Sequence, residues 1–158
     1  MQWSKLKARV QDFICPELRG RIDFHLTSYR GSHDGADKVW ITVDGHRVFS
    51  CKHYPYEWAE AEAYQGGLRG DQVKELLREK EIHRPKDFGD AMRVYLDMPI
   101  REALESKDPL VRAFAIVDRR LGKRTIAKLE LMDSEHSLVK AFHKLRLGSA
   151  AHLTKPCS

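Results

Sequence analysis

Histidine and aspartate residues gather in one stretch of the chain and are its first candidates for chemistry. His33, Asp34 and Asp37 lie close together in GSHDGADK, and His46 and His53 follow soon after. Imidazole and carboxylate groups held together can bind a metal ion or act as general acid and base. The chain has no HExxH or CxxC motif that would fix such groups at metal-binding spacing. We therefore predict no metal and no cofactor, and a hydrolase that uses His33 and Asp34 ranks last among three functions.

Cys51 is the second candidate for chemistry, because Lys52 and His53 follow it directly. Adjacent residues of a strand point to opposite faces, so these neighbours do not form a pair of nucleophile and base. The chain also lacks GxGxxG, GxxxxGK[ST] and GxSxG, the motifs of nucleotide-binding proteins and serine hydrolases. The sequence therefore assigns no catalytic residue and favours a protein that is not an enzyme.

Basic residues of the last third are the candidate binding residues. The net charge is +5, and residues 101–158 hold 12 Lys/Arg against 7 Asp/Glu, whereas residues 1–100 hold 16 of each. Such a surface can bind nucleic acid or an acidic protein. The alternative is an ordinary solvated surface, since the helix macrodipole favours cations near a helix C-terminus. We define the basic cluster as Arg112, Arg119, Arg120, Lys123 and Arg124.

Asp118 is the acidic residue within this segment. On a helix from Asp108 to Arg124 it would lie at the border of the apolar stripe, where a carboxylate needs a partner or water. We expect Arg124 or another nearby arginine to be that partner. A salt bridge that stabilises the fold is the favoured interpretation, and a positioned catalytic acid is the alternative.

The elements that position these residues begin with a helix and a strand. Trp3, Leu6, Val10 and Phe13 recur at helical spacing, and residues 22–27 alternate between apolar and polar side chains, as in a half-buried strand.

A hairpin is the strongest local pattern in the chain. Asp44 and Gly45 separate the β-rich runs KVWITV and HRVFSCKHY, and both residues suit the positive φ angles of a type I′ turn. The first half therefore predicts a helix followed by three antiparallel strands.

The second half predicts helices. Gly66 and Gly67 end a short helix, Asp71 is the expected N-cap of the next one, and from Pro99 to Leu147 almost everything has helical spacing. These patterns predict an α+β fold, in which an N-terminal helix and a three-stranded antiparallel sheet pack with a C-terminal helical bundle. We predict a single domain over residues 1–148, made of a helix-sheet-helix part (1–65) and a helical part (71–148), and a tail over 149–158.

Two helical segments of this bundle resemble each other. Leu110 and Phe114 of the first segment match Leu138 and Phe142 of the second, 28 residues later. A solenoid generally needs three or more repeats. We therefore interpret the pair as similar helices that dock in similar ways.

The order of a helix, three strands and a helix over residues 3–65 resembles that of a double-stranded-RNA-binding domain. Such domains contact RNA phosphates. Glu57, Glu60 and Glu62 would repel phosphate from the second helix, so only the order of elements is carried over.

The motifs WSKLK, FICPELRGRIDF, TSYR, WITVDG and DPLVRAFAIVDRRLGKR together resemble a family of uncharacterised bacterial cytoplasmic proteins of about this length. The resemblance implies no activity and no catalytic residues. Three cysteines and the lack of a long apolar run agree with a cytoplasmic protein that has reduced thiols.

Two functions remain ahead of the hydrolase. The first is a non-enzymatic binding or scaffold protein, whose partner meets the basic cluster or the outer face of the sheet. The alternative is nucleic-acid binding through the basic cluster on the C-terminal helices.

Overall fold

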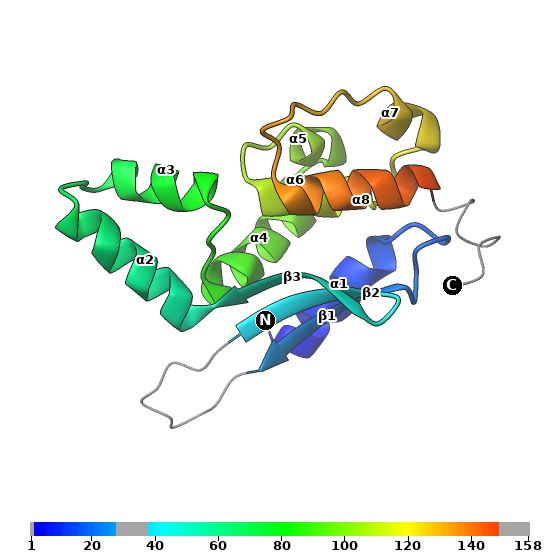
Figure 1. Ribbon diagram of the computed structural model, residues 1–158. Coiled ribbons are helices and arrows are strands. Elements are labelled where there is room, and N and C mark those ends of the chain that lie inside the picture. Colours follow the sequence, from blue (N-terminus) through cyan, green and yellow to red (C-terminus); the bar gives the residue numbers. More distant parts are fainter. Residues whose placement is uncertain (1, 28–37, 149–158) are drawn as a thin grey trace, which may run out of the picture.

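The computed structural model describes residues 2–27 and 38–148, and it has the α+β architecture that the sequence predicts (Figure 1). The predicted tail over 149–158 lies outside the described residues. The elements in chain order are α1 (Trp3–Phe13), β1 (Ile22–Thr27), β2 (Lys38–Val43), β3 (His46–Lys52), α2 (His53–Gln65), α3 (Asp71–Glu79), α4 (Pro85–Asp97), α5 (Ile100–Leu104), α6 (Pro109–Ile116), α7 (Lys123–Ala127) and α8 (Ser137–Gly148).

The three strands form one antiparallel sheet in the order β1-β2-β3. Asp44 and Gly45 have φ angles of 52° and 81°, which confirms the predicted hairpin turn between β2 and β3. Side chains alternate along each strand, and Phe24, Ile41 and Phe49 are buried on the inner face. Because this alternation has a period of two, the intervening residues form an outer face.

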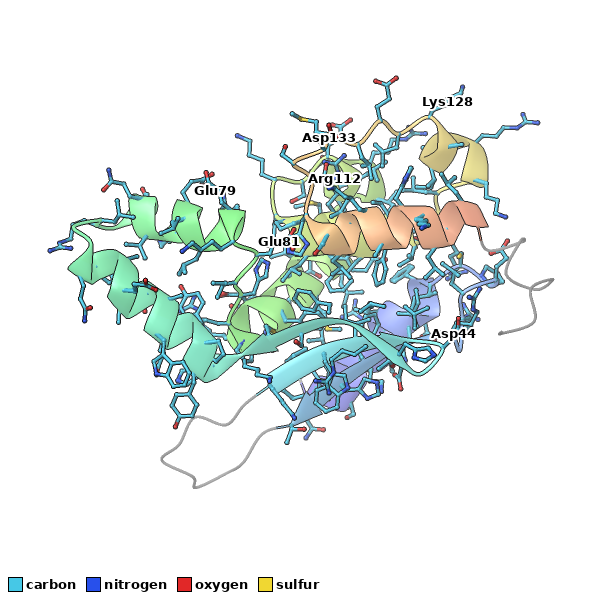
Figure 2. The ribbon with its side chains drawn as sticks, in the orientation of Figure 1. Asp44, Glu79, Glu81, Arg112, Lys128 and Asp133 are labelled. Atoms are coloured by element: carbon cyan, nitrogen blue, oxygen red, sulfur yellow. The ribbon has the colours of Figure 1, made fainter. Side chains whose placement is uncertain are left out.

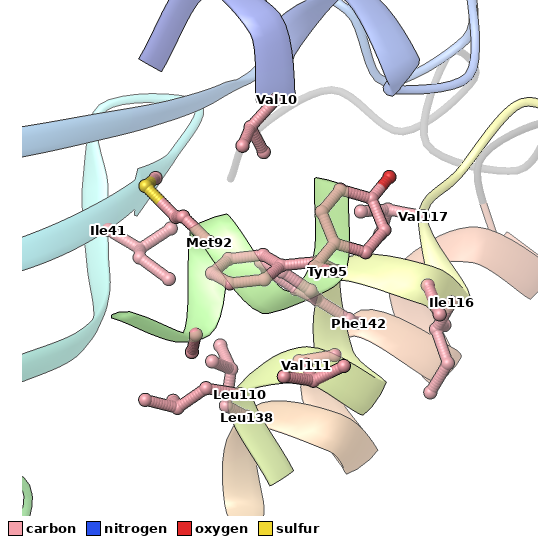
Figure 3. Packing of buried hydrophobic residues seen from close by; sticks show 14 of the residues in the cluster. Val10, Ile41, Met92, Tyr95, Leu110, Val111, Ile116, Val117, Leu138 and Phe142 are labelled. Carbon is pink, nitrogen blue, oxygen red and sulfur yellow. The ribbon is translucent and has the colours of Figure 1, made fainter. Parts of the chain in front are cut away.

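The main core lies between the inner face of the sheet and helices α1, α4, α6 and α8. Figure 3 shows Met92 and Tyr95 of α4 beside Ile41 of the sheet, with Leu110 of α6 and Phe142 of α8 completing the packing. Aromatic rings fill much of this space, and each buries a large apolar area. None of the helices in the described part of the chain is long and apolar enough to cross a membrane.

Helices α2 and α3 form a separate helical hairpin, which we call the arm, spanning residues 53–79. The arm has its own small core around Tyr56, Ala63, Val73 and Leu77. In Figure 1 it extends away from the body, and α7 lies at the other side of the molecule. The helix after the sheet therefore packs mainly on α3.

The prediction of nearly continuous helix after Pro99 was too extensive. The helix that starts at Pro109 ends at Ile116, and residues 128–136 between α7 and α8 are not helical. The chain leaves the helix because the backbone of Asp118 forms a bridge with Ile14, a tertiary contact that overrides helical spacing.

The N-cap predicted at Asp71 was wrong by one residue. Asp71 is the first helical residue, and Gly70, with φ of 53°, is the N-cap. Asp71 still lies in the first turn, where the helix macrodipole favours a negative charge.

The two similar segments become α6 and α8, which pack against each other. Leu110, Phe114, Leu138 and Phe142 are all buried in the main core. This supports the interpretation of two similar helices that dock in similar ways.

Candidate functional site

The outer face of the sheet presents nine side chains in three rows across β1, β2 and β3. The rows are Asp23, Thr42 and Arg47; His25, Trp40 and Ser50; and Thr27, Lys38 and Lys52. This outer face carries three Lys/Arg side chains and one acid, which is Asp23. The Asp23 carboxylate is already bound by the Lys7 ammonium (2.7 Å) and the Gln11 amide (3.0 Å), so the remaining charge of the face is positive.

A β-bulge places Arg47 on this face. The pairing shifts between Ile41 and Thr42, so that Phe49 pairs with Ile41 but Arg47, rather than Val48, pairs with Thr42. In regular pairing Arg47 would point to the inner face with Phe49, because strand side chains alternate. Bulges commonly re-aim a side chain in this way.

Trp40 lies at the centre of the outer face, on the middle strand. Its ring stacks on the His25 ring at 5.0 Å and an interplanar angle of 11°. The Lys38 ammonium and the Arg47 guanidinium lie 5.3 and 5.2 Å from its ring centroid, within the range of cation–π interactions. The His25 Nε2 atom lies 2.8 Å from the Thr42 hydroxyl, which fixes the orientation of the imidazole. Trp40 was not among the residues that the sequence motifs indicated. The alternation of Lys38, Trp40 and Thr42 could have indicated it, but the bulge that adds Arg47 depends on tertiary pairing.

The residues of the predicted basic cluster differ in their contacts: some pair with acids of the protein and others are exposed. Arg112 donates to the Glu135 carboxylate at 2.8 Å, and the two side chains are only 21% and 12% exposed. Arg120 donates to the buried Asp118 carboxylate at 2.7 Å. Lys123 and Arg124, on α7, are exposed and form no salt bridge within the described residues.

Arg119 and Arg120 also hold the end of α1. Their guanidinium groups lie 5.6 and 4.1 Å from the ring centroid of Phe13, and the Arg119 backbone N–H donates to the Phe13 carbonyl at 2.7 Å. Three of the five predicted binding residues thus have structural contacts. Binding of a partner by the cluster remains a prediction.

Asp118 has the salt bridge that the sequence favoured, and its partner is Arg120 rather than Arg124. Its side chain is fully buried and accepts hydrogen bonds from the Tyr95 hydroxyl and the Arg120 backbone N–H. The pKa of Tyr95 is raised, mainly by burial and in second place by the Asp118 carboxylate. The Tyr95 hydroxyl therefore stays protonated. The buried Arg146 guanidinium donates to the Asp118 carbonyl at 2.9 Å. The Asp118 side chain is closed off from solvent, and its contacts explain it as a structural residue.

A pair of histidines lies where the arm joins the body. His136 Nδ1 accepts a hydrogen bond from the Leu138 backbone N–H (3.0 Å), so the proton of the neutral ring is on Nε2 and donates to His83 Nε2 at 2.9 Å. Burial lowers the pKa of His136 to about 4, Glu81 opposes this shift and His83 adds to it. A metal ion would need the Nε2 lone pair of His136, and the proton takes that position. This tautomer therefore favours a structural pair over a metal site.

Glu81 adjoins the histidine pair and holds the first residue of α8. Its carboxylate accepts from the backbone N–H of Ser137 (2.6 Å) and from the Ser137 hydroxyl. Burial alone would raise the pKa of Glu81, but these hydrogen bonds outweigh it and the pKa is lowered. Figure 2 shows Glu81 at the start of α8.

A cavity of about 440 Å³ lies between the arm and α4. Its lining mixes cations, such as Lys74 and Arg84, with the carboxylates of Asp87, Asp90 and Asp108. The mixture selects no class of charged ligand.

Within the described residues, the two cysteines are buried thiols, and His33, Asp34 and Asp37 of the first histidine cluster are not among those residues. Cys15 and Cys51 are unpaired and buried, and burial raises the pKa of Cys51 to about 12, so it stays a thiol at neutral pH. The His53 Nε2 atom lies 2.8 Å from a carboxylate oxygen of Glu57.

Comparison with known proteins places the chain in a family. The chain belongs to the SF0329 protein family, whose sequence profile matches residues 2–147. No curated protein and no solved structure gave a significant match.

Proposed function

We propose that this member of the SF0329 protein family is a non-enzymatic binding protein that holds single-stranded nucleic acid on the outer face of its sheet. The observation that carries the proposal is the position of Trp40 on the middle strand of that face. Lys38 of the same strand and Arg47 of β3 both lie beside its ring. Proteins that bind single strands combine a basic surface with aromatic side chains on which bases stack.

Each part of the face has a role in this proposal. Lys38, Arg47 and Lys52 contact phosphates, while the ring system of Trp40 and His25 accepts a base. The half-exposed His25 ring continues the Trp40 surface toward β1, because the two rings are stacked nearly parallel. Three phosphate contacts predict that log K falls with log salt at a slope of about −2 for a single strand, so affinity drops roughly 20-fold from about 50 to about 200 mM salt.

The proposal is tested by fluorescence anisotropy with a labelled oligonucleotide of about 12 nucleotides, near the upper site size of such surfaces. We expect the variant Arg47→Glu/Lys52→Glu to bind at least about 10-fold more weakly, because it replaces two attractions to phosphate with repulsions. Both side chains are exposed, so the fold is expected to persist.

The matched control is Lys123→Glu/Arg124→Glu, which changes the net charge by the same amount at exposed positions of the basic cluster. If the control binds normally while the sheet variant does not, the outer face is the binding surface. The reverse result supports the second candidate function, nucleic-acid binding through the basic cluster, which is favoured by the exposure of Lys123 and Arg124. Absence of binding at low salt, or binding that both variants keep, overturns the proposal.

A further inference from the structure

The arm carries the most exposed aromatic side chain among the described residues. Trp58 is 70% exposed, and its ring stacks on Tyr54 at 6.0 Å and an interplanar angle of 23°. On α2, Trp58 lies opposite Tyr56 and Ala63, which pack against α3. The aromatic pair therefore contributes nothing to the core of the arm. Trp and Tyr are enriched at protein interfaces, so this exposed, stacked pair is a candidate contact surface.

The surface around this pair is acidic. Residues 53–65 contain no Lys or Arg and three glutamates, Glu57, Glu60 and Glu62. The whole arm, residues 53–79, has a net charge of −3, so the rest of the chain carries +8. The arm is thus the acidic part of a basic protein.

A complementary surface lies on α7. Lys123, Arg124 and Lys128, which we call the α7 surface, are exposed and form no salt bridge within residues 2–27 and 38–148. Figure 1 places the arm and α7 at opposite sides of the molecule, and Figure 2 shows the same separation for Glu79 and Lys128. A chain therefore cannot bring its own arm to its own α7 surface.

We propose that the arm of one molecule binds the α7 surface of a second copy of this chain. A guanidinium or ammonium group of the α7 surface lies on the Trp58 ring, and the glutamates of α2 pair with the remaining cations. The contact joins two different surfaces, and the form that we propose is a closed, two-fold dimer, in which two antiparallel molecules each place the arm on the α7 surface of the other. The proposal uses a surface other than the outer face of the sheet and does not depend on nucleic-acid binding.

Sedimentation velocity of the full chain tests this proposal. We expect a monomer–dimer equilibrium at low salt, weakened at about 0.5 M salt because exposed charges are then screened. Trp58→Ala should weaken the dimer at least 10-fold. The matched control is Met132→Ala, which removes a side chain that is 72% exposed and lies outside the arm. Circular dichroism verifies that each variant is folded.

A charge exchange makes the test specific for the two surfaces. One variant carries Glu57→Lys/Glu62→Lys and the other Lys123→Glu/Arg124→Glu. Each variant alone should be monomeric, because like charges then face each other, and an equimolar mixture should restore the dimer. A wild-type protein that stays monomeric at low salt overturns the proposal. So does a dimer that survives Trp58→Ala, or a mixture that fails to associate.

Discussion

Replacing Asp118 with alanine is expected to lower the free energy of unfolding by about 3–5 kcal/mol. The carboxylate is fully buried and satisfies the Tyr95 hydroxyl, the Arg120 backbone N–H and the Arg120 guanidinium. Without it, a buried hydroxyl and a partly buried cation lose their acceptor, and the desolvation cost of unpaired polar groups is larger than the net gain of an ordinary hydrogen bond. Urea unfolding followed by circular dichroism measures the difference.

Two control variants distinguish the loss of this hydrogen-bond network from the loss of a negative charge in general. Asp133→Ala removes an exposed aspartate and should change stability by no more than about 0.5 kcal/mol. Asp118→Asn keeps the shape and one acceptor oxygen, so its cost should lie between the two. If Asp118→Ala unfolds at nearly the wild-type urea concentration, the Tyr95–Asp118–Arg120 network is not a major source of stability.

Acidification from pH 6.5 to 4 is expected to remove about 3 kcal/mol of stability through His136 alone. In the unfolded chain the imidazole has its ordinary pKa near 6.5, whereas in the folded protein burial lowers the pKa to about 4. Between pH 4 and 6.5 the unfolded state binds a proton that the folded state does not bind, so the free energy of unfolding falls as pH falls. The full contribution of His136 to stability is present above pH 6.5. The pKa of His83 is also lowered by burial, and that of Glu81 is lowered, so both act in the same direction.

The variant His136→Asn isolates this contribution. Its amide oxygen can accept the Leu138 N–H as the imidazole does, since asparagine is a good N-cap residue, but it does not titrate. The variant should therefore lose less stability than the wild-type protein between pH 6.5 and 4. Urea unfolding at several pH values gives this difference, and parallel pH profiles for the two proteins would show that His136 is not the titrating group.

The path of the chain at Asp118 shows that local sequence patterns predict some parts of the fold and not others. The sheet hairpin and α1 follow from side chains that are near neighbours in sequence, such as the Asp44-Gly45 turn, whose φ angles agree with the prediction. The end of α6 does not. Its continuation has good helical spacing, yet the chain turns at Val117. The Cys15 backbone N–H donates to the Val117 carbonyl at 2.8 Å and Ile14 forms a bridge with Asp118, so segments about a hundred residues apart are joined there.

The candidate sites, too, could be predicted only in the features that depend on local sequence. Basic residues after Asp108 were visible as a charge excess, but counting charges does not show that Arg112 meets Glu135 and Arg120 meets Asp118. The histidine pair had no local pattern at all, since His83 and His136 come from distant segments.

The amino-acid sequence by itself determined the class of the fold, the order of the first helix, the three strands and the two helices of the arm, the hairpin and the excess of positive charge in the last third. Each of these depends on periodicity, on turn residues or on composition, which act over a few neighbouring residues. Only the tertiary structure decided which arginines are paired internally, that a bulge brings Arg47 beside Trp40, and that the acidic arm lies far from α7. These depend on which distant segments pack together, and the free energy of that packing is a property of the whole chain.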